Sequence, residues 1–384
     1  MTAELVIVGG GPVGLSFAIA ASHLPNVAVT VIERDDAATE RRPDSFDHRV
    51  YALSPGSLGF LRDIGTELPA ARLAPIRAMQ VWGDDLNSEL DFAAGQPLAT
   101  IVEHAVVMQA LQQRLDADAR VRFMRGVSPN AMRQATGNRR LLVLPDGGVV
   151  ESDLLIAADG ARSQLREWAG IACQPKSYES DGVVANFHCQ YPHGDIARQW
   201  FSHDSVLAFL PLPGNHVSIV WSVATAFSRS LPTGDANAFA ILVRDAGQNA
   251  LGAMTLVSPV ARFPLARIVA ADWVRPGLAL MGDAAHAVHP LAGQGVNLGF
   301  ADARDMVDLL AGRSKYAAIG DVALLRRYER MRREAAWAVG EVTDRLRGLY
   351  LSEQSAAKWL RNEGLRLTNR LPAVKSMLVD YAAD

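Results

Sequence analysis

The feature that most constrains the fold is a glycine-rich turn close to the N-terminus. Residues 4–8 (ELVIV) form a short apolar strand signal, and three glycines spaced as G-x-G-x-x-G follow at once within residues 9–14. A helical pattern covers about residues 12–23, and residues 27–32 predict a second strand that ends at Glu33. Strand, turn, helix and second strand within about 30 residues predict a β-α-β unit, and therefore an α/β domain with a parallel sheet.

The spacing of the glycines predicts a dinucleotide-binding turn. Gly9 permits a tight turn, Gly11 lets the backbone approach a pyrophosphate, and Gly14 lets the helix pack on the strand. The helix that begins at Pro12 offers unpaired N–H groups and a partial positive charge to the phosphates. Glu33, at the end of the second strand, can accept hydrogen bonds from a ribose. The turn does not distinguish FAD from NAD, so an NAD-dependent dehydrogenase is an alternative at this point.

The middle of the chain has a different texture and predicts a second domain. Alternating and aromatic segments between about 178 and 262 suggest antiparallel strands separated by Pro, Gly and Asn turns. Residues 278–281 then return to a short buried strand. We expect a discontinuous nucleotide-binding domain at residues 1–75, 100–177 and 262–340, an inserted substrate domain at residues 76–99 and 178–261, and a C-terminal helical region at residues 341–384.

Composition excludes several classes of protein. The chain has 38 Lys and Arg against 41 Asp and Glu, a net charge of −3, which does not suggest a nucleic-acid partner. Cys173 and Cys189 form no CxxC pair and suit buried thiols in a reducing cytoplasm. The apolar N-terminal stretch has three consecutive glycines and only Glu4 before it, so we expect neither a signal peptide nor a membrane span.

Two further patterns suggest sites that we do not expect. His286 and His289 have a metal-like spacing, but no carboxylate or cysteine ligand accompanies them; we expect no metal and a role in the turn or beside a flavin. Arginines 326, 327, 330, 332 and 333 are expected to form a solvated helix face beside Glu329 and Glu334.

A second glycine-rich segment, residues 277–302, favours FAD over NAD. A strand ends at Gly282-Asp283, and a turn rich in Gly and Pro leads to a helix that starts near Gly295. Asp283 can accept hydrogen bonds from the ribityl hydroxyls of a flavin. The start of the helix can direct N–H groups at the flavin pyrimidine edge, which becomes anionic on reduction.

These segments resemble those of a known family. Residues 277–302 resemble the GD motif of class A flavin monooxygenases, and residues 289–299 (HPLAGQGVNLG) with Asp302 resemble the signature of the ubiquinone-biosynthesis hydroxylases. Residues 153–166 (DLLIAADGARSQLR) resemble the DG motif, and residues 47–54 (DHRVYALS) the D-x-R-x-x-A-L-S segment. The resemblance covers essentially the whole chain. Its tail departs from the family at the last residues, Ala-Ala-Asp, where Met-Gly is expected.

The resemblance implies a fold like that of para-hydroxybenzoate hydroxylase: a Rossmann-like FAD-binding domain with an inserted antiparallel substrate domain and a helical C-terminal region. It implies FAD as cofactor, NADPH or NADH as a transient reductant, and transfer of oxygen from a flavin hydroperoxide to a polyprenylated phenol or quinol. The implied cofactor-binding residues are Gly9, Gly11, Pro12, Gly14, Glu33, Arg34, Arg49, Gln109, Asp159, Gly160, Asp283, Pro290, Gly295, Val296 and Asn297. The implied active-site turn contains Pro290, Gly293, Gln294 and Gly295, and residues 200–221 are expected to cover it. No catalytic acid or base can be named.

Other functions remain as alternatives. They are a flavin hydroxylase of a soluble aromatic metabolite and a flavin-binding subunit of a biosynthetic complex. A halogenase is disfavoured because no W-x-W-x-I-P segment occurs, and a disulfide reductase because a second G-x-G-x-x-G is missing. We expect a cytoplasmic protein with a small aromatic substrate and no nucleic-acid partner. The sequence leaves open a peripheral contact with the inner membrane or a complex, and a homo-oligomer.

Overall fold

A six-stranded sheet carries the N-terminal turn. The computed structural model describes residues 2–36, 45–83, 89–93, 95–202, 205–287, 295–314 and 316–351. The sheet order is β19-β20-β12-β1-β2-β8, and all neighbours are parallel except β19 and β20. The strands are β1 (Ala3–Val8), β2 (Val27–Ile32), β8 (Val121–Met124), β12 (Leu154–Ala157), β19 (Val274–Arg275) and β20 (Leu278–Leu280).

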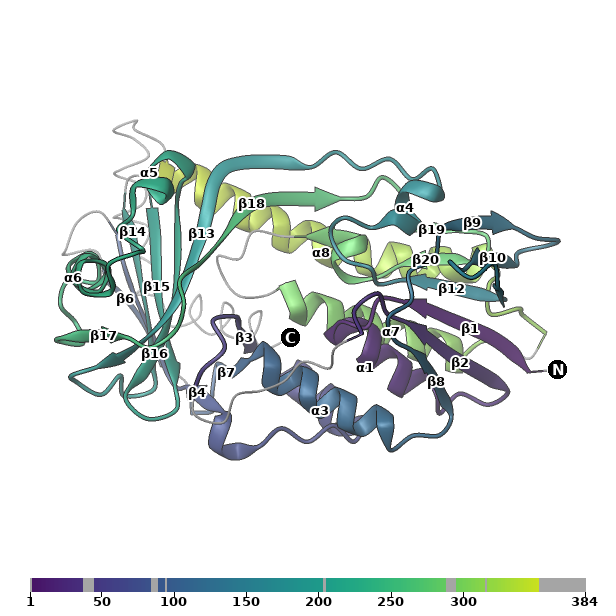
Figure 1. The fold of residues 1–384 in the computed structure, drawn as a ribbon, viewed down its shortest axis with the longest axis horizontal. Helices are drawn as coiled ribbons and strands as arrows, with labels where there is room; N and C mark the ends of the chain where they lie inside the picture. The colour runs from purple at the N-terminus through teal and green to yellow at the C-terminus, as the bar shows by residue number, and fades with distance from the viewer. Residues whose placement is uncertain are drawn as a thin grey trace.

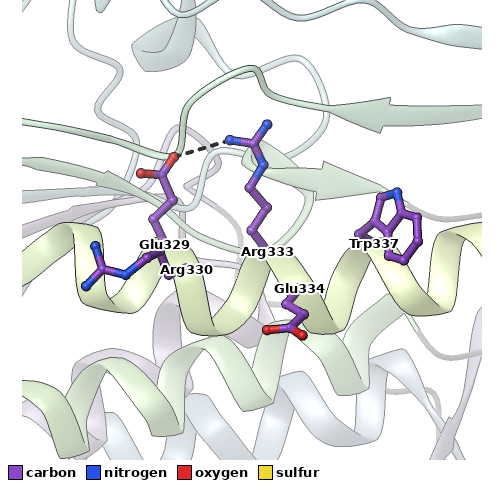
Figure 2. Close-up of a pocket in the computed structure, with 5 residues that line it drawn as sticks. All are labelled: Glu329, Arg330, Arg333, Glu334 and Trp337. Carbon is purple, nitrogen blue, oxygen red and sulfur yellow. Dashed lines mark ion pairs between the residues drawn. The ribbon is translucent and has the colours of Figure 1, made fainter.

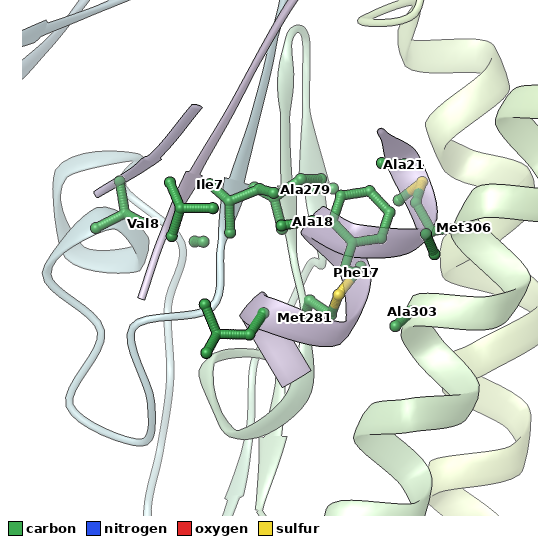
Figure 3. Packing of buried hydrophobic residues seen from close by; sticks show 14 of the residues in the cluster. Ile7, Val8, Phe17, Ala18, Ala21, Ala279, Met281, Ala303 and Met306 are labelled. Atoms are coloured by element: carbon green, nitrogen blue, oxygen red, sulfur yellow. The ribbon is translucent and has the colours of Figure 1, made fainter. Parts of the chain in front are cut away.

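Helices cover one face of this sheet, and a small antiparallel sheet lies on its other side (Figure 1). The helices of this half are α1 (Pro12–Ala21), α2 (Pro55–Asp63), α3 (His104–Asp116), α4 (Gln164–Trp168), α7 (Gly295–Ala311) and α8 (Val322–Leu351). The small sheet contains β9 (Ala131–Gln134), β10 (Arg140–Val143) and β11 (Val149–Ser152). Figure 3 shows Phe17 of α1 among Ala279 of β20, Met281 just after that strand, and Ala303 and Met306 of α7. Phe17 is fully buried, so truncation to alanine would cost about 3–5 kcal/mol.

A nine-stranded, mostly antiparallel sheet forms the other half of the molecule, at the opposite end in Figure 1. Its order is β21-β18-β13-β16-β15-β14-β5-β6, with β17 paired to β13. The strands are β5 (Ala78–Trp82), β6 (Glu89–Ala93), β13 (Lys176–Cys189), β14 (Ile196–Ser202), β15 (Ser205–Leu212), β16 (His216–Ala224), β17 (Met254–Leu256), β18 (Ala261–Val269) and β21 (His286–Ala287).

A three-stranded sheet connects the two halves. It contains β3 (Val50–Leu53), β4 (Ala74–Ile76) and β7 (Ala99–Glu103), in the order β3-β7-β4. Its apolar residues Ile76 and Ile101 share a cluster with Ala197 and Leu212 of the large sheet. Residues 50–53 and the start of α3 therefore lie between the two large sheets.

The predicted strands and helices are mostly confirmed, and one prediction was wrong. Residues 225–246 are not strands but contain the helices α5 (Thr225–Ser230) and α6 (Ala236–Ala246). The side chain of Asp235 caps α6 by accepting hydrogen bonds from the N–H groups of Asn237 and Ala238. The apolar face of α6, including Phe239, then packs on the large sheet. Within the described ranges, no helix has both the length and the hydropathy that a membrane span requires.

Candidate functional site

Four loops lie side by side at the carboxyl edge of the parallel sheet. They follow β1, β2, β12 and β20, whose ends are in register: Val8 lies opposite both Ile32 and Ala157, and Ala157 lies opposite Leu280. The chain passes from β1 to β2 on one side and later returns to β12 on the other side of β1. Ligands of open α/β sheets bind outside the carboxyl ends at such a reversal of strand order.

The glycine turn has the geometry that a dinucleotide needs. A Cβ on Gly9 (φ +114°) would lie 2.1 Å from the carbonyl oxygen of Ala158, and a Cβ on Gly14 would lie 2.0 Å from that of Gly9. A Cβ on Gly11 would meet no atom within 4 Å, so its backbone faces open space. Gly11 is the N-cap of α1 and no side chain caps the helix. The first N–H groups of α1 are therefore available to a pyrophosphate, and the turn fits the cofactor.

Glu33 is at the predicted position, at the end of β2. Its carboxylate accepts hydrogen bonds from the N–H groups of Gly10 and of Asp35 (2.9 Å for the latter). These bonds fix the carboxylate beside the glycine turn, and its remaining lone pairs can accept from a ribose. Arg34 is exposed and pairs with Asp35 at 3.5 Å, on the outside of this loop.

The predicted DG motif lies at the end of β12, next to the glycine turn. One carboxylate oxygen of Asp159, Oδ2, accepts from the N–H of Leu165 (3.2 Å), and Gly160 has a φ of +80°. The other oxygen, Oδ1, is buried and has no hydrogen-bond partner of ordinary geometry among the described residues. Burial raises the pKa of the Asp159 carboxyl, and nearby hydrogen-bond donors only partly offset this.

Arg166 joins this motif to the GD segment, a role that we did not predict. Its guanidinium is buried and donates hydrogen bonds to the carbonyl oxygens of Ala161 and Ala284, both at 2.9 Å. The two carbonyls belong to loops more than a hundred residues apart in the sequence. The arginine therefore fixes the position of one loop relative to the other.

A buried network built on Asp302 fixes the turn after β20. Its carboxylate accepts hydrogen bonds from the N–H of Gly282 (3.0 Å), Nε2 of His286 (2.6 Å) and Nε of Arg332 (2.7 Å). Burial opposes the charge of Asp302, but His286 and Arg332 outweigh it and hold the pKa of its carboxyl below the usual range. Arg332 also donates to the carbonyl oxygen of Leu298 in the first turns of α7 (3.2 Å).

This network corrects one prediction and refines another. Arg332 does not belong to the solvated face of its helix, because it is buried and neutralises Asp302. We expected His286 either to stabilise the turn or to lie beside a flavin, and the structure shows the first role. Its ring also stacks on Trp273, with ring centroids 4.8 Å apart.

Asp283 faces the site from the end of this turn. It is exposed, yet protein surrounds it closely enough that burial raises the pKa of its carboxyl, against the opposing charges of His286 and Arg49. Arg49, which is far away in the sequence, is close enough to influence Asp283, so the structure brings these two predicted residues together.

The side chain of Asn297 joins the start of α7 to β3, a contact that was not predicted. Its amide group donates to the carbonyl oxygen of Ala52 (2.8 Å) and accepts from the N–H of Ser54 (3.1 Å). The side chain thus fastens the start of α7 to the end of β3. Gly295, Val296 and Asn297 form the first turn of α7, so their backbone N–H groups have no partner within the helix.

The remaining predicted residues are partly outside the described ranges. Gln109 lies on α3 and is half-buried. Pro290, Gly293 and Gln294 lie outside the described residues, as does His289.

A surface groove on α8 is separate from the four loops. It has a volume of about 490 Å³ and is lined by Glu329, Arg330, Arg333, Glu334 and Trp337 (Figure 2). Glu329 accepts a hydrogen bond from the N–H of Trp273 (2.8 Å) and pairs with Arg333 at 3.8 Å. None of the predicted cofactor-binding residues lines this groove, so the carboxyl edge of the parallel sheet is the candidate site.

Comparison with known proteins agrees with this geometry. Residues 2–343 match the family model described as an FAD binding domain. The chain is 34% identical over 388 residues to 3-demethoxyubiquinol 3-hydroxylase of Escherichia coli, covering 99% of this chain and 98% of the relative. It is 30% identical over 431 residues to the mitochondrial ubiquinone biosynthesis monooxygenase COQ6 of Homo sapiens, covering 99% of this chain and 92% of the relative.

Solved structures confirm the predicted fold. A probable FAD-dependent monooxygenase, pqsL from Pseudomonas aeruginosa, superposes with a TM-score of 0.79 at 20% identity, over 96% of this chain and 100% of that one. The p-nitrophenol 4-monooxygenase PnpA from Pseudomonas putida gives 0.77 at 18% identity, over 100% and 98%. The prediction of FAD as cofactor is confirmed by the family match. The chain belongs to the FAD-binding-domain family of flavin-dependent monooxygenases, which includes the ubiquinone-biosynthesis hydroxylases.

Proposed function

We propose that this protein hydroxylates the aromatic ring of a polyprenylated phenol or quinol on the way to ubiquinone, using FAD, NAD(P)H and O2. The proposal is supported by full-length similarity to a 3-demethoxyubiquinol 3-hydroxylase and a ubiquinone biosynthesis monooxygenase. The observation that carries it is the convergence of four loops at one edge of the parallel sheet, after β1, β2, β12 and β20. The chemistry that FAD supplies when bound is uptake of a hydride from NAD(P)H and activation of O2.

The residues of the four loops would hold the cofactor. The backbone at Gly11 and the start of α1 would bind the diphosphate, and Glu33 the ribose beside it. Asp283 would accept from hydroxyls of the ribityl chain, and Arg49 would face a phosphate. The first N–H groups of α7 would donate to the pyrimidine edge of the flavin, where negative charge grows on reduction.

The large sheet would supply the cover of the substrate site. Val184 lies opposite Val220, and Val220 lies opposite Ala208, so the three form a row across one face. Asn186, on the same face of β13, donates from its side-chain nitrogen to the carbonyl oxygen of Asp47 (2.9 Å). That bond orients the face towards the segment that carries Arg49. Small apolar side chains, two of them partly exposed, suit a flat ring, and their burial by a ring would keep water out.

Other parts of the prediction also become proposals. The division into nucleotide-binding residues 1–75, 100–177 and 262–340 and substrate residues 76–99 and 178–261 is retained, although β18 crosses the boundary at 261/262. A substrate with a polyprenyl tail would be taken from a membrane surface or from a lipid-binding partner, so we propose a cytoplasmic protein with a peripheral membrane contact.

The test is substrate-dependent oxidation of NAD(P)H with product analysis. The FAD-loaded protein would be assayed with matched phenols that carry a long tail, a short tail or no tail. We expect hydroxylated product with the tailed compounds and a kcat/KM that rises with tail length, because each buried CH2 adds about 0.8 kcal/mol. Equal turnover of an untailed ring would instead favour a soluble metabolite. Full complementation by an Asp283→Ala variant that lacks activity would favour a non-catalytic subunit.

A further inference from the structure

We propose that Tyr51 and His104 are positioning residues, which hold the guanidinium of Arg49 ready for a phosphate of the bound dinucleotide. The inference rests on the placement of Arg49 at the FAD site that is proposed above. It does not depend on the substrate. Tyr51 fills a variable position of the D-x-R-x-x-A-L-S segment, and His104 lies outside the motifs discussed above.

The backbone of Arg49 is fixed at both ends. Its N–H donates to Oδ1 of Asp47 (3.0 Å), and its carbonyl oxygen accepts from the N–H of His104 (2.8 Å). Asp47 is itself held, because its Oδ2 accepts from the N–H of Ala105 (3.2 Å) and its own N–H donates to Glu103 (2.7 Å). The start of α3 therefore sets the position of the Arg49 backbone.

Tyr51 then sets the direction of the Arg49 side chain. The guanidinium carbon lies 5.5 Å from the centroid of the Tyr51 ring, within range of a cation–π contact. The hydroxyl of Tyr51 lies 2.7 Å from Nδ1 of His104. The ring that supports the guanidinium is thus tied to the same residue that holds the Arg49 backbone, and the contacts form a closed loop through Arg49, Tyr51 and His104.

Both partners of this hydrogen bond are neutral. Burial raises the pKa of Tyr51 to about 12 and lowers that of His104 to about 4. Between pH 5 and 9 neither partner therefore carries a charge, and we assign the Tyr51 hydroxyl as the donor to Nδ1 of His104. The pair supports Arg49 without adding a charge that would compete for it.

The positive charge of Arg49 remains available. The residue is exposed, and among the described residues no carboxylate lies within ion-pair distance of its guanidinium. Asp283 is near enough to influence it but does not pair with it. A fixed guanidinium without an ion-pair partner among the described residues is suited to a phosphate, because the entropy of ordering the side chain has already been lost.

The experiment is a double-mutant cycle on FAD affinity, measured by titration of the apoprotein. Tyr51→Phe keeps the ring and removes the hydrogen bond; we expect Kd to rise about 3- to 10-fold. Arg49→Met removes the charge; we expect a rise of about 10- to 100-fold. If Tyr51 acts through Arg49, the double variant will match Arg49→Met within about 2-fold. Multiplication of the two effects would overturn the proposal, and so would an unchanged Kd in Tyr51→Phe.

Variants of His104 provide a second, independent test. His104→Asn keeps an acceptor near the position of Nδ1, whereas His104→Leu removes it; both keep the backbone N–H on Arg49. We expect wild-type FAD affinity in the first and the Tyr51→Phe value in the second. Equal affinity in the two variants would contradict the proposal, even if a Tyr51 variant failed to fold.

A control variant and the result for Arg49→Met separate the positioning role of Tyr51 and His104 from the placement of Arg49 at the FAD site. Tyr178→Phe also removes one buried tyrosine hydrogen bond, to Asp344 on α8, and should leave the FAD Kd unchanged. Wild-type affinity in Arg49→Met would refute the placement of Arg49 at the FAD site. Weak binding in Arg49→Met with normal binding in Tyr51→Phe and His104→Leu would refute only the positioning role.

Discussion

Replacement of Asp302 by asparagine tests whether the buried network holds the turn after β20. Asp302 is fully buried and accepts three hydrogen bonds, from Gly282, His286 and Arg332. The asparagine side chain has nearly the same shape as the aspartate but carries no charge. Its NH2 group would also face at least one of the three groups that donate to Asp302 in the wild type. Breaking a buried ion pair by removal of one partner costs about 3–5 kcal/mol. Arg332 keeps a second ion pair, with Asp305 at 3.1 Å, so the cost here lies at the lower end of that range. We therefore expect the free energy of unfolding of the apoprotein to fall by about 3 kcal/mol, more than a hundredfold in the unfolding constant.

The assay is urea unfolding of the wild type, Asp302→Asn, Arg332→Met and the double variant. The double variant should be more stable than the sum of the single effects predicts, because it leaves no unpaired charge. The pKa of Asp302 is lower in the folded protein than in the unfolded chain, so its contribution is present above about pH 4 and is lost as the pH falls further. A cost below about 1 kcal/mol for Asp302→Asn, or additive single effects, would refute the reasoning.

Three further predictions follow from the geometry of the site. Gly14→Ala should lose FAD binding and stability, because its Cβ would lie 2.0 Å from the carbonyl oxygen of Gly9. Gly11→Ala should keep the stability of the apoprotein and weaken only FAD binding, because its Cβ would meet no atom within 4 Å. Thermal melting and FAD titration distinguish the two variants. Asn297→Ala should raise the FAD Kd about 10-fold, since two hydrogen bonds that fasten α7 are lost; an unchanged Kd would contradict that role. Burial lowers the pKa of His104 to about 4 in the folded protein, against 6.5 in the unfolded chain. The wild type should therefore lose stability as the pH falls from 6.5 to 4, by up to about 3 kcal/mol more than His104→Asn. Parallel plots of stability against pH for the two proteins would refute this.

The loops of the site could be predicted because each follows a strand signal. Glycines and acids at the ends of four apolar strands must meet if the strands are parallel and adjacent. This is why Gly9, Glu33, Asp159 and Asp283 were found from the sequence and lie side by side in the structure.

The supporting contacts could not be found in this way, because they join distant segments. Arg166 and Ala284 are 118 positions apart, and Tyr51 and His104 are 53 apart, with no local pattern that links them. Arg332 did leave a signal: it falls on the buried stripe of α8 that includes Leu325 and Tyr328. A charged residue on the apolar stripe of a helix indicates a buried partner, and that stripe could have distinguished Arg332 from its solvated neighbours.

The most direct test of the proposed function is incorporation of oxygen from 18O2. The FAD-loaded protein would be incubated with NAD(P)H and a polyprenylated phenol under labelled oxygen gas, and the product analysed by mass spectrometry. The account predicts a hydroxylated ring that carries one atom of 18O, formed only when all three components are present. Oxidation of NAD(P)H that yields hydrogen peroxide and an unchanged phenol, across ring substrates with and without a tail, would contradict it.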